Sequence, residues 1–249
     1  MDVNDFLKKL KGSYVFDNHE KWLKNIFEVV KKVNLYLEDD FFTNHFEHFE
    51  FSNDGIKKDN YFKFHQGMWH LHMMYFFLKN GFKLIKPAGK DDIAIDMGNF
   101  KIYIECTCPS WGRQNNYIGK TYIEMSKGYT EISKLYENFI EKSVYSINNK
   151  IEEQIEKRKR NQDGFYLVAI NEGLLINGFD TLDSQRKGPK DRANDVMSRI
   201  NNPILDGIIY GSISESSYCQ IEDKMFGKLN NLDDQFIKVF KKFGWVCGE

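Results

Sequence analysis

The sequence predicts a mixed α/β fold, in which helices pack on a β-sheet. Two observations predict it. Stretches with apolar residues at helical spacing alternate with short runs rich in β-branched and aromatic residues, which are typical of strands. The order of these stretches is helix, three strands, helix, strand and strand, which indicates a mixed sheet with helices on it.

The N-terminal part of the chain is expected to be helical. Residues 1 to about 53 are amphipathic, and HEKWLKNIFEVVKKVNLYL has its apolar residues at helical spacing. A polar, glycine-containing break over 52–60 precedes a second helix over 61–79, which Asn80-Gly81 would end as a C-cap. We therefore expect a helical region over residues 1–55, packed on an α/β domain over residues 56–249.

Three short strands are predicted next: FKLIKP, DDIAID and FKIYIECTC, with MGN as a hairpin turn between the last two. A loose loop over 111–129 leads to a long helix over 131–160 that ends in KRKR. GFYLVAIN is almost wholly apolar, which favours a central strand. The charged segment over 180–195 is predicted to be a mobile surface loop. PILDGIIYGSIS is predicted to be a strand and DDQFIKVFKKFG a final helix.

Two acidic residues flank this predicted hairpin on one face. Side chains alternate across a strand, so Glu105 points away from the apolar face that contains Ile104 and Cys106. The same alternation places Asp92 opposite the apolar side chains of its own strand. Two carboxylates on adjacent strands would repel each other unless a cation lies between them, and Mg²⁺ or Mn²⁺ prefers such oxygen ligands. The alternative is that Asp91-Asp92 is simply a solvated turn.

This pattern resembles the PD-(D/E)XK nuclease superfamily, which has the restriction-endonuclease-like fold. The resemblance covers about residues 62–170. GKDDIAID matches the acidic element with Asp92, and IYIECTCPSWG matches the E-x-K strand with Glu105. FHQGMWHLHMMYFFLKNGF resembles the first helix of the family, and SINNKIEEQ resembles the helix after the strands, where some branches place a lysine. The implied fold is a restriction-endonuclease-like mixed β-sheet core flanked by helices, with an N-terminal helical extension.

Three positions depart from the family pattern. Thr107 replaces the motif lysine, His70 occupies the place of an acid in the first helix, and Lys90 stands where a proline is expected. Threonine has no positive charge, so its hydroxyl can only hydrogen-bond a water. Lys150 is the candidate for a displaced lysine, because it lies next to the buried stripe of its helix and its ammonium could extend into a cleft. The alternative is an ordinary solvated lysine.

The resemblance implies a divalent-metal-dependent nuclease with Mg²⁺ or Mn²⁺ as cofactor. The implied metal ligands are Asp92, Glu105 and the backbone carbonyl of Cys106. The candidate catalytic residues are Asp92, Glu105, Thr107, Lys150 and His70. His70 is either part of an aromatic cluster or a support for the metal ligands. Cys106 and Cys108 form a C-x-C pair, but alternation places both side chains on the apolar face, which favours core packing.

Nucleic acid is the expected partner, and DNA the expected substrate. The formal net charge is −1, so any phosphate contact must come from local basic groups. The candidates are Arg113, Lys157, Arg158, Arg160, Arg186 and Lys187, within a broader basic segment that reaches Arg192. Cysteine usage and the absence of a signal peptide or a long apolar run predict a cytoplasmic protein without a membrane partner. A homodimer is left open.

Two other functions remain open. A catalytically inactive relative could serve as a nucleic-acid-binding or protein-interaction module, which is suggested by Thr107 in place of lysine. The N-terminal helical region could alternatively dock a partner protein through Trp22, Phe27 and Tyr36.

Overall fold

The computed structural model describes residues 1–12, 19–48, 51–52, 55–56, 61–87, 91–109, 129–152, 164–173, 189–200, 202, 204–213, 225–229, 234 and 236–238. Its helices are α1 (Val3–Lys11), α2 (His19–Val33), the 3-10 helix η1 (Asn34–Tyr36), α3 (Phe41–Phe46), α4 (Tyr61–Lys79), α6 (Tyr129–Lys150) and α10 (Pro189–Arg199). Its strands are β1 (Phe51–Ser52), β2 (Gly55–Ile56), β3 (Lys83–Ile85), β4 (Ile93–Asp96), β5 (Lys101–Thr107), β6 (Phe165–Asn171), β7 (Gly207–Gly211) and β8 (Met225–Leu229).

The main sheet has six strands in the order β3-β4-β5-β6-β7-β8. The strands β3, β4 and β5 form an antiparallel meander, β5, β6 and β7 are parallel, and β8 is antiparallel to β7. Parallel neighbours need a crossover connection, and α6 and α10 lie in the two crossovers of this sheet. The predicted mixed α/β class is confirmed, and the predicted central position of the apolar strand β6 is confirmed as well.

The predicted hairpin of β4 and β5 is also confirmed. Ile93 pairs with Ile104 and Ala94 with Tyr103 in an antiparallel register. The turn closes with the amide of Met97 donating to the carbonyl of Phe100, and Gly98 has a φ of +87°, which glycine adopts without strain. One further step along this register places Asp92 across from Glu105.

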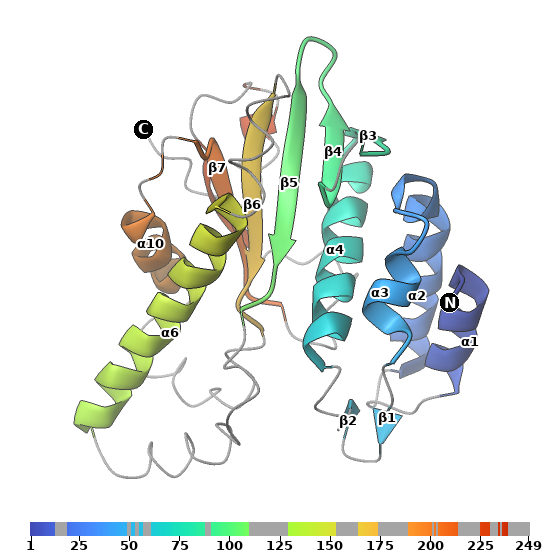
Figure 1. Ribbon diagram of the computed structural model, residues 1–249, viewed down its shortest axis with the longest axis horizontal. Helices are drawn as coiled ribbons and strands as arrows, with labels where there is room; N and C mark the ends of the chain where they lie inside the picture. The colour runs from blue at the N-terminus through green and yellow to red at the C-terminus, as the bar shows by residue number, and fades with distance from the viewer. Residues whose placement is uncertain are drawn as a thin grey trace.

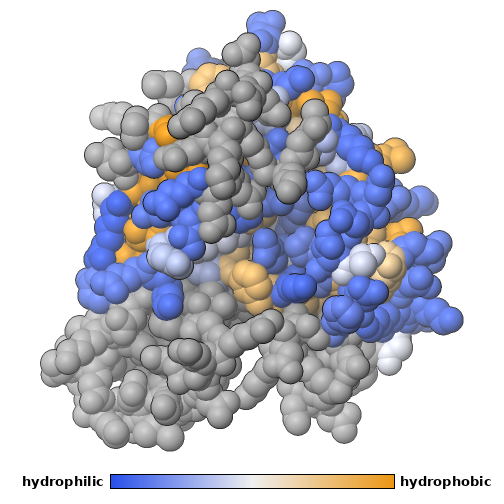
Figure 2. All heavy atoms as spheres, viewed as in Figure 1, coloured by the Kyte–Doolittle hydropathy of each residue, from blue (hydrophilic) through white to orange (hydrophobic). Residues whose placement is uncertain are grey.

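The two faces of the sheet are covered by different helices (Figure 1). The first hydrophobic core, here called the α4 core, joins the N-terminal helices and α4 to Ile95, Ile104 and Leu167 of the sheet. The second, here called the α6 core, packs α6 and α10 against Tyr103 and Val168 on the opposite face. On the side of the molecule seen in Figure 2, most of the described surface is hydrophilic, with hydrophobic groups between.

The helix predicted over residues 61–79 is confirmed as α4, and it ends at Asn80-Gly81 as expected. Gly81 has a φ of +83°, and the amide of Phe82 donates to the carbonyl of Phe77 at 3.0 Å, which satisfies a helix-terminal carbonyl. Buried apolar side chains surround α4 because it lies between the sheet and the N-terminal helices. None of the described helices is long and apolar enough to cross a membrane.

The prediction of a surface loop over 180–195 is wrong for the residues from 189 onward. Residues from Pro189 onward form α10, and Arg192 is only 6% exposed because it pairs with the buried carboxylate of Glu172. Proline is well suited to the first position of a helix, so its presence does not exclude one. Three strands were not predicted: β1 and β2, which form a short hairpin overlapping the expected polar break, and the edge strand β8.

Candidate functional site

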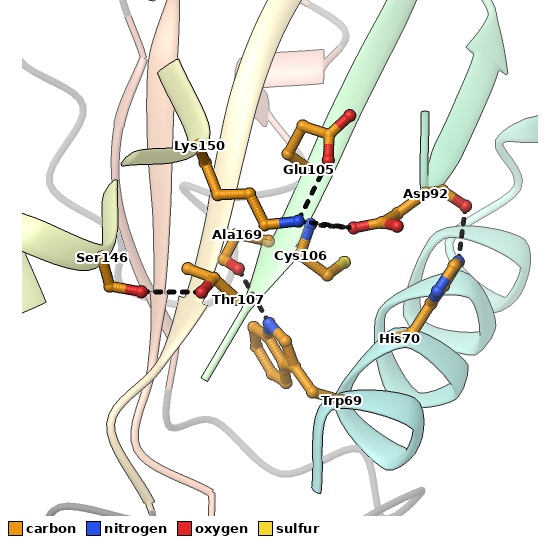
Figure 3. Close-up of polar contacts among 9 residues, drawn as sticks. All are labelled: Trp69, His70, Asp92, Glu105, Cys106, Thr107, Ser146, Lys150 and Ala169. Atoms are coloured by element: carbon orange, nitrogen blue, oxygen red, sulfur yellow. Dashed lines mark hydrogen bonds and ion pairs between the residues drawn. The ribbon is translucent and has the colours of Figure 1, made fainter. Parts of the chain in front are cut away.

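The carboxylates of Asp92 and Glu105 converge on one lysine at the α6 face of the sheet (Figure 3). The Lys150 Nζ atom lies 3.3 Å from Glu105 Oε2 and 3.8 Å from Asp92 Oδ2. The side chain of Glu105 is 2% exposed, that of Lys150 15% and that of Asp92 22%. The cluster is therefore largely enclosed and opens to solvent on the side of Asp92.

Asp92 is fixed at both its carboxylate and its backbone. The amide of Cys106 donates to Asp92 Oδ2 at 2.6 Å, which ties the carboxylate to the neighbouring strand β5. The imidazole of His70 bonds the Asp92 carbonyl from α4. A carbonyl oxygen can only accept, so His70 Nε2 must bear the proton in this contact. Two elements, β5 and α4, thus hold Asp92 in place.

His70 is at once a member of an aromatic cluster and a support for the site. It is 5% exposed, and burial lowers its pKa, so the imidazole is neutral at pH 7. Its ring meets that of Phe41 edge-on, with centroids 4.9 Å apart and an interplanar angle of 87°. Since its hydrogen bond goes to the Asp92 backbone, the contact positions this acid rather than placing the imidazole among the acidic groups.

Lys150 lies in the last turn of α6, and its neighbours Ile147 and Ile151 are buried in the α6 core, as the helical spacing predicts. Burial alone would lower the pKa of Lys150, but Asp92 and Glu105 outweigh burial and raise it above the ordinary value. The group therefore stays a charged ammonium at neutral pH. Its charged end reaches both carboxylates (Figure 3).

Thr107 contacts α6 next to the site, and the described partner of its hydroxyl is on this helix. Its hydroxyl lies 2.7 Å from that of Ser146, one helical turn before Lys150 (Figure 3). This contact ties β5 to α6 beside the position of the ammonium. Ser146 was not predicted from the sequence, and the only sequence signal for it was its spacing of four residues from Lys150.

Trp69 is a second residue that the sequence reasoning did not single out. Its indole N–H donates to the carbonyl of Ala169 on β6 at 2.9 Å, which anchors α4 to the centre of the sheet. Gly211 makes room for the ring, since a Cβ atom there would lie 2.6 Å from Trp69 Cη2. This anchor fixes the helix that presents His70 to Asp92.

The side chains of Cys106 and Cys108 are buried in the α4 core, as alternation predicts, and both are free thiols. Burial, together with the nearby Asp92 carboxylate, raises the pKa of the Cys106 thiol well above its ordinary value, so it remains protonated. What Cys106 offers the site is its backbone, which already holds Asp92.

The donors at this site suit a hard divalent cation that retains water. Within the described part of the chain, no group of three or more His, Cys, Asp or Glu side chains is arranged to hold a metal ion. The site instead offers two carboxylates and adjacent backbone, and Mg²⁺ is commonly held by one or two carboxylates plus waters. The Lys150 ammonium lies within ion-pair distance of both acids, so their negative charge is already partly offset in this structure.

The predicted nucleic-acid contacts Arg113, Lys157, Arg158, Arg160, Arg186 and Lys187 lie outside the described residues. Arg192, at the end of the broader basic segment, is buried against Glu172 and does not face solvent. Of the residues suggested for partner docking, Trp22 is buried in the α4 core, whereas Phe27 is 40% exposed.

Comparisons with known protein families, with curated proteins and with solved structures found no match for this chain. Any functional conclusion therefore depends on the residues and geometry of the site itself.

Proposed function

We propose that this protein is a divalent-metal-dependent nuclease with a restriction-endonuclease-like core, acting on phosphodiester bonds in DNA. The observation that supports the proposal is the convergence of Asp92, Glu105 and Lys150 at one enclosed point. Two acids from an antiparallel hairpin and an ammonium beside them are the groups that the E-x-K motif brings together, although here the lysine comes from a helix.

Asp92 and Glu105 would hold the ion, Mg²⁺ or Mn²⁺, together with the carbonyl of Cys106. When bound, such an ion makes water more acidic and offsets negative charge on the phosphate. The hydrogen bonds from Cys106 and His70 keep Asp92 in place before a substrate arrives, so little reorganisation is needed at the moment of reaction.

Lys150 would take the place of the absent motif lysine. Its ammonium can orient the attacking water or stabilise the negative charge that develops on the phosphate. Thr107 cannot do this, because its hydroxyl has no charge and is engaged with Ser146. In this proposal Thr107 positions α6, and through it Lys150, instead of contacting the substrate.

The test is cleavage of plasmid DNA in Mg²⁺ or Mn²⁺ by the wild-type protein and by Asp92→Ala, Glu105→Ala and Lys150→Ala. Each substitution removes either a ligand of the ion or the ammonium that acts on the water or the phosphate, so we expect a loss of at least about a hundredfold in rate.

The matched control is Asp96→Ala, which removes a carboxylate from the same hairpin. Asp96 pairs with Lys83 at 2.6 Å on the surface, away from the site, so cleavage should be unchanged. Equal cleavage by wild type, Asp92→Ala and Glu105→Ala would reject the proposal.

A second candidate is an inactive nuclease-fold module that binds nucleic acid or a protein. The observation that favours it is Thr107, which leaves β5 without the motif lysine. Metal-dependent cutting that is lost in Lys150→Ala would exclude this candidate. DNA binding without any cutting by the wild-type protein would favour it.

A further inference from the structure

We propose that Lys150 competes with the divalent ion for the oxygens of Asp92 and Glu105, and so sets how tightly this site binds metal. The inference rests on the proposed function, because it concerns the same pair of acids. It goes beyond that function by assigning to the lysine a role in the protein without substrate.

The first step is the position of the ammonium. Lys150 Nζ is 3.3 Å from Glu105 Oε2 and donates a hydrogen bond to it, and it is 3.8 Å from Asp92 Oδ2. These are oxygens that an ion shared by the two acids would need. The ammonium is therefore the counter-ion of both acids, at the position proposed for the metal (Figure 3).

The second step is the enclosure of the cluster. The Glu105 side chain is 2% exposed and that of Lys150 15%, so water screens their attraction much less than it would at the surface. A second cation placed among the same oxygens would be repelled by an ammonium that remained there. Metal binding must then displace the ammonium or proceed against its charge.

The third step is the freedom of the lysine to move. Its stem is a flexible chain of four carbons, and it comes from the last turn of α6 rather than from the sheet that bears the acids. The ammonium can leave the carboxylates while the hairpin stays intact. It would then be free to meet an anion such as the substrate phosphate.

The test is Mn²⁺ binding measured by isothermal titration calorimetry without nucleic acid. Lys150→Met keeps the length and apolar stem but removes the charge, and we expect it to bind Mn²⁺ at least about tenfold more tightly than wild type. Lys150→Gln is measured in the same way and should also bind Mn²⁺ more tightly than wild type.

Two controls separate charge from other effects of substitution. Lys150→Arg retains the positive charge and should bind Mn²⁺ about as wild type does. Lys142→Met removes an exposed lysine from the same helix and should also leave the affinity unchanged. The rise in melting temperature on adding Mn²⁺ should be larger for Lys150→Met than for wild type, because tighter binding to the folded state stabilises it more.

The outcomes distinguish this inference from the proposed function. Equal or weaker Mn²⁺ binding by Lys150→Met and Lys150→Gln, with binding lost in Asp92→Ala, would overturn the inference alone. No Mn²⁺ binding by wild type or either variant, or binding that persists unchanged in Asp92→Ala, would overturn both.

Discussion

Two histidines of α4 are buried within the protein as neutral groups. His65 is fully buried and His72 is 1% exposed. Burial lowers the pKa of His65 to about 3 and that of His72 to about 4. In the unfolded chain both would titrate near 6.5, so below that pH the unfolded state binds more protons than the folded state.

We therefore expect the free energy of unfolding to fall as the pH decreases from 7 to 5. The loss begins near the unfolded pKa of about 6.5 and continues towards the folded values. Each histidine would contribute up to about 2 kcal/mol over this interval. Urea unfolding at pH 7 and pH 5 measures the loss, and in His72→Phe the difference between the two values should be smaller. An equal difference in both proteins would contradict this assignment.

Among the secondary-structure elements, α10 is held on the sheet by a buried ion pair. Arg192 donates from Nε and Nη2 to Glu172 Oε1, at 2.9 and 2.6 Å, and the hydroxyl of Tyr210 on β7 also bonds this carboxylate. Burial raises the pKa of Glu172, and Arg192 partly opposes that effect. The cluster joins α10 to the ends of β6 and β7.

Arg192→Met should lower the free energy of unfolding by about 3–5 kcal/mol, because it leaves the Glu172 carboxylate buried without its counter-charge. Chemical denaturation at pH 7 measures the change. The double variant Glu172→Gln/Arg192→Met should recover part of the loss, since no charge is then buried.

Arg199→Met is the matched control for this ion pair. Arg199 also lies on α10, and the substitution breaks its 2.8 Å pair with Glu137 of α6. Both side chains are partly exposed, so the loss should cost less than about 1 kcal/mol. A similar cost for both arginine substitutions would show that the buried pair does not hold α10.

At the scale of the whole molecule, the N-terminal helices and the sheet share the α4 core. The contact between α3 and α4 is especially close at Gly67. A Cβ atom at this position would lie 2.5 Å from Phe46 Cζ and 2.7 Å from His45 Cβ, so α3 or its side chains would have to move.

Gly67→Ala should therefore lower the free energy of unfolding by about 1–3 kcal/mol through overpacking. In an open helix the same substitution would stabilise by about 1 kcal/mol, so the sign of the change is itself informative. Thermal and urea unfolding measure it. Gly12→Ala at the end of α1 is the control, since a Cβ there makes only ordinary contacts at 3.7 Å, and a stabilised Gly67→Ala protein would refute the close packing.

The sequence predicted which side chains of each element face the candidate site, but it did not predict the contacts between elements. Alternation along β4 and β5 was sufficient to place Asp92 and Glu105 on one face, because the period of a strand leaves only two choices. Helical spacing identified Lys150 as a residue next to the buried stripe, but it could not determine which atoms the ammonium would reach.

The missed features depend on contacts between residues distant in the chain. Ser146 meets Thr107 and Trp69 meets Ala169 only after the helices have packed on the sheet. Arg192 belongs to a segment whose charge pattern is typical of an exposed loop, and its burial depends on Glu172, twenty residues earlier. Composition and periodicity contain no information on such pairings.

The two acids and the ammonium of the candidate site come from different secondary-structure elements. Asp92 and Glu105 are thirteen residues apart within one hairpin, whereas Lys150 arrives from the far end of a crossover helix. Fraying of the final turn of α6 would consequently withdraw the ammonium without breaking the β-ladder beneath the two acids. The two carboxylates would then be exposed without their counter-ion. Their exposure would follow local unfolding of a few residues at the end of α6 rather than global unfolding.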